Sequence, residues 1–179
     1  VLLVRSVTKV NADLLAGTPV RFVGTATIGT DHIDENYLCR EGIAFSSAAG
    51  SNANSVAEYV ITAMLVLARQ YRWRLAGKSL GIIGVGNIGS IVERYAQALG
   101  MDVWPCDPPV QERTGDDRFV THAEALEADF VTFHVPLTKT GKWATYHLLD
   151  EKTFATLRPE TIIINSSRGA VVDLSLIHI

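Results

Sequence analysis

Short apolar runs alternate with segments of helical spacing along nearly the whole chain. Several of these runs are continuously apolar, which is typical of parallel strands covered by helices on both faces. The expected strands are residues 1–4, 20–24, 43–47, 80–84, 102–106, 129–135 and 161–165. The expected helices are residues 11–17, 34–42, 54–75, 87–100, 122–128 and 150–157. This alternation predicts an α/β fold built on a doubly wound parallel sheet.

A domain boundary is expected near residue 54. Ser55, with Glu58 three positions later, has the spacing of a capping box and predicts the start of a long helix. Residues 1–53 would then form one small α/β unit, and residues 54–173 a second. Asp31 and Asp34 are interpreted as turn and helix-cap residues.

The charge balance argues against binding to nucleic acid. The formal net charge is −3, and the densest basic stretch, residues 69–74, follows a long helical pattern. Cations at that position complement the negative end of the helix dipole, so a solvated helix end is the favoured interpretation.

Cysteine usage and hydropathy point to a cytoplasmic protein with no membrane or metal partner. Cys39 and Cys106 are far apart and have no metal-ligand or redox spacing, which suits a reducing compartment. The longest apolar stretch, residues 56–68, contains Glu58 and is shorter than the ~20 residues that a membrane span needs.

A glycine-rich loop follows the strand expected at residues 80–84. Gly84, Gly86 and Gly89 have the G-x-G-x-x-G spacing, and a helical pattern follows them. In this motif the glycines permit a tight turn, close approach of a pyrophosphate and close helix–strand packing. The helix N-terminus adds N–H donors and a positive dipole end. We therefore predict a dinucleotide site here, which includes Asn87 and Ile88.

An acidic residue completes this motif at the end of the next strand. Asp107 lies 18 residues after Gly89 (107 − 89), close to the ~20 expected for an acid that binds the adenosine ribose hydroxyls. Its charge would repel a 2′-phosphate, and prolines rather than an arginine follow it, so NAD is favoured over NADP. The alternative is a strand-end acid in an unrelated α/β domain.

Two later strand ends carry polar residues, in "FHVPLT" and "INSSRG". Ligands bind at the carboxyl ends of parallel strands, so Arg168 is a candidate for gripping a substrate carboxylate and polarising a neighbouring carbonyl. Gly169 is expected to let the chain turn sharply and direct Arg168 into the crevice. The alternative is an arginine in a structural ion pair.

The histidines are weaker candidates. His134 lies within an apolar strand, and a structural histidine is the favoured interpretation there. His32, His122 and His147 occupy loop or helix-start positions without a partner visible in the sequence.

Together, "LGIIGVGNIG", "FHVPLT" and "INSSRGAVVD", after "GSNANSVAEYV", resemble the NAD-dependent D-2-hydroxyacid dehydrogenases from Val1 to about Asp173. The resemblance implies a Rossmann-type NAD domain preceded by part of a smaller, flavodoxin-like substrate domain. The segments "LLVRSVTKVN", "VGTATIGTDHID" and "CDPP" are similar to those of members that oxidise 4-phospho-D-erythronate at C2 in pyridoxal 5′-phosphate synthesis. The substrate would then be a small phosphorylated 2-hydroxy acid.

The resemblance also assigns residue roles. Arg168 would be the catalytic arginine that binds the carboxylate and the 2-oxygen of the substrate. The residues implied to contact substrate are Ser6, Thr27 and Arg5. Those implied to line the nicotinamide side of the site are Val135, Ser166 and Ser167, largely through backbone groups. Relatives in the family are homodimers, so a homodimeric parent is expected.

The family's catalytic glutamate and histidine are expected outside this chain, after Asp173. The chain also opens at Val1 inside an apolar run, so we expect it to be an internal fragment without turnover. Residues 174–179, "LSLIHI", resemble translated transposon-adapter sequence. They are hypothesised to be a non-native tail in which His178 is not a site residue.

Three alternatives stay open from the sequence. The first is a sister dehydrogenase acting on phosphoglycerate or on glyoxylate and hydroxypyruvate. The second, of another class, is an NADH-sensing binding protein. The third is an inactive remnant of a dehydrogenase.

Overall fold

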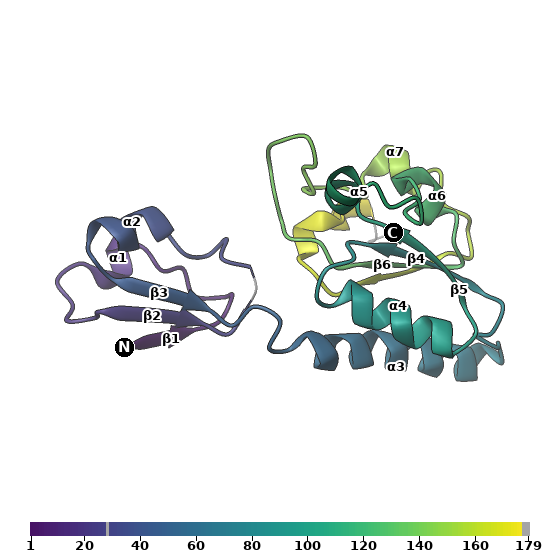
Figure 1. Ribbon diagram of the computed structural model, residues 1–179, viewed down its shortest axis with the longest axis horizontal. Coiled ribbons are helices and arrows are strands. Elements are labelled where there is room, and N and C mark those ends of the chain that lie inside the picture. Colours follow the sequence, from purple (N-terminus) through teal and green to yellow (C-terminus); the bar gives the residue numbers. More distant parts are fainter. Residues whose placement is uncertain (28, 177–179) are drawn as a thin grey trace. The chain divides into compact units, whose positions relative to one another are not determined.

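The computed structural model describes residues 1–27 and 29–176, and the chain divides into two compact units, Val1–Asn52 and Ala53–Ile179 (Figure 1). Each unit has its own parallel sheet and its own hydrophobic core.

The first unit is a three-stranded parallel sheet of order β1-β2-β3 with two short helices. Its elements are β1 (Leu2–Val4), α1 (Ala12–Leu15), β2 (Phe22–Thr25), α2 (Glu35–Arg40) and β3 (Ala44–Ser47). Val23 at the centre of the sheet packs with Leu15 and Leu38 from the two helices. Asp34 accepts the N–H of Tyr37 and caps α2, as predicted.

The second unit is a four-stranded parallel sheet of order β5-β4-β6-β7. Its strands are β4 (Ser79–Ile83), β5 (Asp102–Cys106), β6 (Phe130–Phe133) and β7 (Ile162–Asn165). Its helices are α3 (Ala53–Tyr71), α4 (Gly89–Ala98), α5 (Pro108–Thr114), α6 (His122–Leu126) and α7 (Glu151–Phe154), followed by the 3₁₀ turns Gly169–Val171 and Leu174–Leu176. The predicted α/β class and parallel sheet are confirmed.

Helices cover both faces of this sheet. Figure 1 shows α3 and α4 on one side and α5, α6 and α7 on the other. Alternate residues of β4 serve the two faces, because successive side chains of a strand point in opposite directions. Leu80 and Ile82 pack with α3 and α4, whereas Ile83 packs with α6. On that second face, a Cβ on Gly81 would lie 2.1 Å from the backbone oxygen of Ala125, so only glycine allows α6 to approach this closely.

The expected strands and helices all form, with bounds that differ by a few residues at most for the strands. One helix was not predicted. Asp107 accepts the N–H of Val110 and caps α5, and Pro108 and Pro109 occupy its first positions. Proline favours the first turn of a helix because its φ is already helical and its missing N–H would have no partner there.

The capping box predicted at Ser55 and Glu58 is wrong. The long helix α3 begins at Ala53, so Ser55 lies inside its first turn rather than at the cap. The carboxylate of Glu58 instead accepts the side-chain N–H of Asn54 over 2.6 Å. The donor to Glu58 is therefore the side-chain amide of Asn54, and not the backbone N–H that a capping box would use.

The hypothesised tail, residues 174–179, is described only as far as Leu176, which ends a short 3₁₀ turn. His178 lies outside the described residues. Within residues 1–27 and 29–176, no helix combines the length and apolar character that a membrane crossing requires.

Candidate functional site

The carboxyl edge of the four-stranded sheet carries every residue predicted to bind cofactor. Asp107 follows β5, the glycine loop follows β4, Val135 follows β6, and Ser166 to Arg168 follow β7. In the order β5-β4-β6-β7 the glycine loop therefore lies between Asp107 after β5 and Val135 after β6, and the serine–arginine segment after β7 is one strand further along the edge. From β4 the chain adds β5 on one side and then crosses over to add β6 and β7 on the other. Open parallel sheets bind ligands at such a switch in strand order.

The glycine loop needs its three glycines for three different reasons. Gly84 has a φ of +92°, and a Cβ there would meet Val135 at 2.8 Å. A Cβ on Gly89 would lie 2.1 Å from the carbonyl oxygen of Gly84, which keeps helix and loop in contact. A Cβ on Gly86 would meet no protein atom within 4 Å. The open space at Gly86 is where the motif requires room for a pyrophosphate, so the loop fits a dinucleotide.

The helix behind the loop presents its positive end to the same space. Ile88 is the N-cap of α4, and no side chain caps it. The backbone of Ser90 bonds back to Gly86, and that of Val92 to Ile88. Asn87 lies in the same turn, where its carbonyl accepts the hydroxyl of Ser90 at 3.4 Å. An uncapped N-terminus favours a bound anion, because its first N–H groups and the helix dipole both attract negative charge.

Asp107 has a structural task that the sequence did not reveal. One carboxylate oxygen accepts the N–H of Val85 at 2.8 Å, and the other accepts that of Val110 at 3.1 Å. The residue thus fixes the glycine loop and starts α5 at the same time. A carboxylate has about four lone-pair sites, so these two bonds leave capacity for ribose hydroxyls.

Cys106, the residue before Asp107, stays protonated. Burial, followed by the charges of Asp107 and Glu124, raises the pKa of its thiol to about 12.

His134 is a structural residue at the end of β6, as predicted. Its Nε2 lies 3.1 Å from the hydroxyl of Thr132, and its Nδ1 lies 2.9 Å from the hydroxyl of Ser166. Burial lowers the pKa of His134 to about 4, so the ring is neutral near pH 7. The histidine therefore ties the end of β6 to the start of the segment after β7.

The segment that carries Arg168 is organised by Asn165. The side-chain oxygen of Asn165 accepts the N–H and the hydroxyl of Ser167, and its amide donates to the carbonyl of Arg168 at 2.9 Å. Arg168 itself is extended, with φ −121° and ψ 139°. Sequence reasoning missed Asn165, although an asparagine directly after an apolar strand is a recognisable turn former.

The role predicted for Gly169 is wrong. Its φ is not left-handed, and a Cβ there would meet Leu174 at 3.5 Å, which is an ordinary contact. The turn is a 3₁₀ turn with its own hydrogen bonds, in which the N–H groups of Val171 and Val172 bond to Arg168 and Gly169. It is also supported from outside, because the N–H of His147 bonds to Ala170 and that of Leu149 to Val171. The loop after β6 thus supports the segment after β7.

The residues implied to contact substrate lie in the first unit, also at strand carboxyl ends. Arg5 and Ser6 are exposed in the turn after β1, and Thr27 is half-buried after β2. Thr27 belongs to a hydrogen-bonded chain with Thr25 and His32. His32 lies in a turn, as predicted, and it is buried against a partner, Thr25, that the sequence did not reveal.

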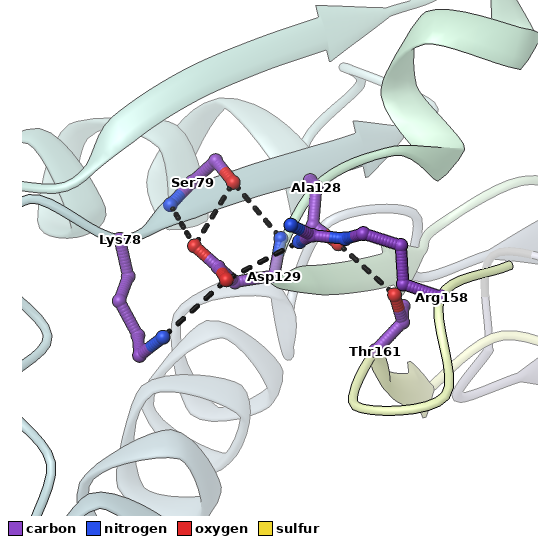
Figure 2. Close-up of polar contacts among 6 residues, drawn as sticks. All are labelled: Lys78, Ser79, Ala128, Asp129, Arg158 and Thr161. Atoms are coloured by element: carbon purple, nitrogen blue, oxygen red, sulfur yellow. Dashed lines mark hydrogen bonds and ion pairs between the residues drawn. The ribbon is translucent and has the colours of Figure 1, made fainter.

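The amino edge of the four-stranded sheet is closed by a polar cluster around Asp129 (Figure 2). One oxygen of Asp129 accepts the N–H and hydroxyl of Ser79, and the other contacts Lys78 at 3.3 Å and Arg158 at 3.2 Å. Ser79 in turn accepts the N–H of Asp129. Burial raises the pKa of Asp129, but the bonds from Ser79 and Lys78 outweigh it, so the net pKa is lowered. This cluster ties β4 to β6. Both carboxylate oxygens of Asp129 already accept bonds from protein groups, whereas the space at Gly86 is open.

The fold and the glycine-loop edge define a dinucleotide-binding dehydrogenase domain, and comparison with known proteins gives its family. Residues 55–178 match "D-isomer specific 2-hydroxyacid dehydrogenase, NAD binding domain". The chain belongs to this family, and NAD is the cofactor of the domain.

Three of the similar proteins are named as dehydrogenases. An erythronate-4-phosphate dehydrogenase of Tolumonas auensis is 55% identical over 97% of this chain and 47% of its own length. Among solved structures, 3-phosphoglycerate dehydrogenase of Entamoeba histolytica with bound NAD⁺ has a TM-score of 0.81 at 28% identity, covering 97% of this chain and 57% of that one. D-lactate dehydrogenase of Aquifex aeolicus, with NAD and lactic acid, has a TM-score of 0.77 at 27% identity, covering 98% and 58%. The chain spans about half the length of the curated relatives it matches.

Proposed function

We propose that this chain is part of an NAD-dependent dehydrogenase that oxidises 4-phospho-D-erythronate at C2, in the cytoplasmic synthesis of pyridoxal 5′-phosphate. One observation carries the proposal. The 55% identity to a protein named erythronate-4-phosphate dehydrogenase extends over 97% of the chain, and so includes the first unit as well as the NAD-binding unit. In this proposal residues 1–53 are part of the substrate domain, residues 54–173 are part of the NAD domain, and the parent is a homodimer.

The residues at the two carboxyl edges have distinct proposed tasks. Gly84, Gly86 and Gly89, with Asn87 and Ile88, hold the pyrophosphate, and Asp107 binds the adenosine ribose. Bound NAD supplies a nicotinamide that accepts the hydride from C2. The residues proposed to line the nicotinamide side are Val135, Ser166 and Ser167.

Arg168 is proposed to grip the substrate carboxylate and to polarise the 2-oxygen. A planar guanidinium offers two parallel donors to a carboxylate, and its charge stabilises the oxygen as C2 becomes a carbonyl. Ser6 and Thr27 contact the substrate, and Arg5 helps to hold its phosphate. The hydroxyl proton passes to the histidine that the family resemblance assigns to a segment beyond Asp173.

Substrate choice tests the proposal. The 175 matched residues of the Tolumonas auensis relative would be replaced by this chain, and the turnover of 4-phospho-D-erythronate and 3-phospho-D-glycerate would be compared with NAD. We expect kcat/KM to favour 4-phospho-D-erythronate by roughly 100-fold or more. Equal or better turnover of 3-phospho-D-glycerate would identify a sister dehydrogenase instead. Binding of NADH without oxidation of either acid would identify a binding protein.

Arg168 offers the matched pair of variants in the same hybrid. Arg168→Lys keeps the charge but not the planar fork, and Arg168→Ala removes both. We expect both to lower kcat, the alanine variant by more, with NADH affinity nearly unchanged. An Arg168→Lys variant with native kcat would contradict the proposed bidentate grip.

A further inference from the structure

Three side chains at the carboxyl edge of the first unit form a continuous hydrogen-bonded chain. Nε2 of His32 lies 3.1 Å from Oγ1 of Thr25, and Oγ1 of Thr25 lies 2.8 Å from Oγ1 of Thr27. The hydroxyl of Thr27 donates to the carbonyl oxygen of Gly29 at 2.9 Å. Thr25 and His32 are buried, whereas Thr27 is half-buried and accessible. The chain therefore runs from the interior to the surface on which the proposed substrate contacts lie.

The direction of each hydrogen bond follows from the last acceptor. A carbonyl oxygen can only accept, so the single proton of the Thr27 hydroxyl is used on Gly29. Thr27 must then accept from Thr25, and Thr25, having used its own proton, must accept from His32. The ring of His32 therefore carries its proton on Nε2.

The other ring nitrogen supports the same assignment. Nδ1 of His32 is buried and has no hydrogen-bond partner among the described residues. With the proton on Nε2, this orphan is a lone pair, whereas the reverse direction would bury an unpaired N–H, which proteins tolerate less well. Nδ1 of the buried His32 ring thus makes no hydrogen bond to the described residues. A histidine at this position is explained if the site requires the Nε2–H donor.

We propose that His32 is a positioning residue that acts through Thr25. Gly29 takes the proton of Thr27, and the bond from Thr25, whose direction His32 sets, fixes which lone pair of the Thr27 hydroxyl is left to accept from the substrate. Thr27 has one lone pair left after accepting from Thr25, and no proton to offer. It therefore recognises a hydroxyl group of the hydroxy acid, and not an oxygen of its carboxylate or phosphate, which can only accept. This assignment rests on the proposed function, which makes Thr27 a substrate contact.

The first test is spectroscopic and needs no substrate. Imidazole ¹⁵N spectra of the whole chain would be recorded, with His32 assigned from its absence in His32→Gln. We expect the Nε2–H tautomer, preserved in Thr25→Ser, which keeps the hydroxyl, and lost in Thr25→Val, which keeps the volume. An Nδ1–H tautomer in the native chain, or an unchanged His32 spectrum in Thr25→Val, would overturn the relay.

The second test separates positioning from general damage, in the hybrid with the Tolumonas auensis relative. The probes are 4-phospho-D-erythronate as substrate and 4-phosphobutyrate, which has the same charged ends but no hydroxyl, as competitive inhibitor. Thr25→Val is expected to raise the KM for the substrate about tenfold and to leave the Ki of 4-phosphobutyrate unchanged. Thr25→Ser and His32→Gln, which retain a donor, should keep both constants near native.

The outcomes are distinguishable. A parallel rise of KM and Ki in Thr25→Val would mean structural damage and overturn the positioning role. An unchanged KM would overturn it as well. If the unmodified hybrid fails to oxidise 4-phospho-D-erythronate, the proposed function falls and the specificity of Thr27 falls with it. The tautomer measurement would still decide the direction of the relay.

Discussion

The two edges of the four-stranded sheet are made by the same strands and lie beside the same two hydrophobic clusters, yet their polar groups are arranged in opposite ways. At the amino edge, Asp129 and Ser79 satisfy each other, and Lys78 and Arg158 neutralise the charge (Figure 2). At the carboxyl edge, the helix α4 starts without a side-chain cap and Gly86 faces open space.

The difference shows how one sheet divides stability from binding. Polar groups that are saturated by protein partners hold strands together, whereas groups left with capacity attract a ligand. Substitutions at the amino edge should therefore change stability alone, and those at the carboxyl edge should change NADH binding.

Gly89→Ala should have the largest effect and should damage both properties. The added Cβ would lie 2.1 Å from the backbone oxygen of Gly84, so helix and loop must separate. We expect a loss of about 3 kcal/mol in the free energy of unfolding, measured by urea denaturation, together with weaker NADH binding. Gly86→Ala is the matched control, because its Cβ meets no protein atom within 4 Å. Equal stability losses in the two variants would contradict the account of the loop.

His134 should make the stability depend on pH. Its pKa falls from 6.5 in the unfolded chain to about 4 in the folded one. Between pH 6.5 and about pH 4 the unfolded chain therefore binds a proton at His134, and the folded chain does not. The contribution of neutral His134 to the free energy of unfolding is fully present above pH 6.5. About 2–3 kcal/mol of it is lost as the pH falls toward 4.

The check is the pH dependence of unfolding in His134→Gln and in the native chain. The pKa of His122 is also lowered by burial, against an opposing effect of Asp150, so it contributes in both proteins and cancels in the difference. Parallel pH curves for the two proteins would show that His134 titrates normally.

Asp129→Asn should lower stability without affecting NADH binding. The amide keeps one acceptor but loses the charge that holds Lys78 and Arg158, for a cost of about 2 kcal/mol. Asp116→Asn is the matched control, because Asp116 pairs with Arg118 on the surface and both side chains are more than 40% exposed. Its loss should stay below about 0.5 kcal/mol. If Asp129→Asn weakens the free energy of NADH binding by as much as it lowers the free energy of unfolding, the two edges are not independent.

Asp107→Asn should give the smallest change in stability, because one of its two backbone bonds survives. Loss of the other is expected to cost about 1 kcal/mol, as for a weakened helix cap. NADH affinity should fall, and discrimination against NADPH should relax, since the charge that would repel a 2′-phosphate is gone. Titration with both nucleotides checks this, and an unchanged NADH-to-NADPH ratio would remove Asp107 from the ribose site.

Much of the fold was predictable because each strand of this chain is a compact apolar run. The glycine loop was predictable because its motif, the preceding strand and the following helix all agree. The start of α3 was predicted to within one residue, but its capping box was not formed, and Glu58 accepts from the side chain of Asn54. Helix α5 was not predicted, although an aspartate cap followed by prolines favours a helix start.

The parts of the site that escaped prediction depend on contacts between distant segments. The partner of His32 is Thr25 on β2, and the direction of that bond depends on the carbonyl of Gly29. The turn after Arg168 is supported by the loop that contains His147, and it does not use a left-handed conformation at Gly169. A residue type and its spacing indicate a possible role, but these tertiary partners become visible only once the chain is folded.

Titration of the chain with NADH, followed by the change in nicotinamide fluorescence, decides whether the carboxyl edge of the four-stranded sheet binds the cofactor. We expect saturable binding that is retained in Asp129→Asn and abolished in Gly86→Val, whose side chain would fill the open space at the loop while sparing the fold. Native binding by Gly86→Val, or no binding by the unmodified chain, would contradict the assignment of the carboxyl edge as the NAD site.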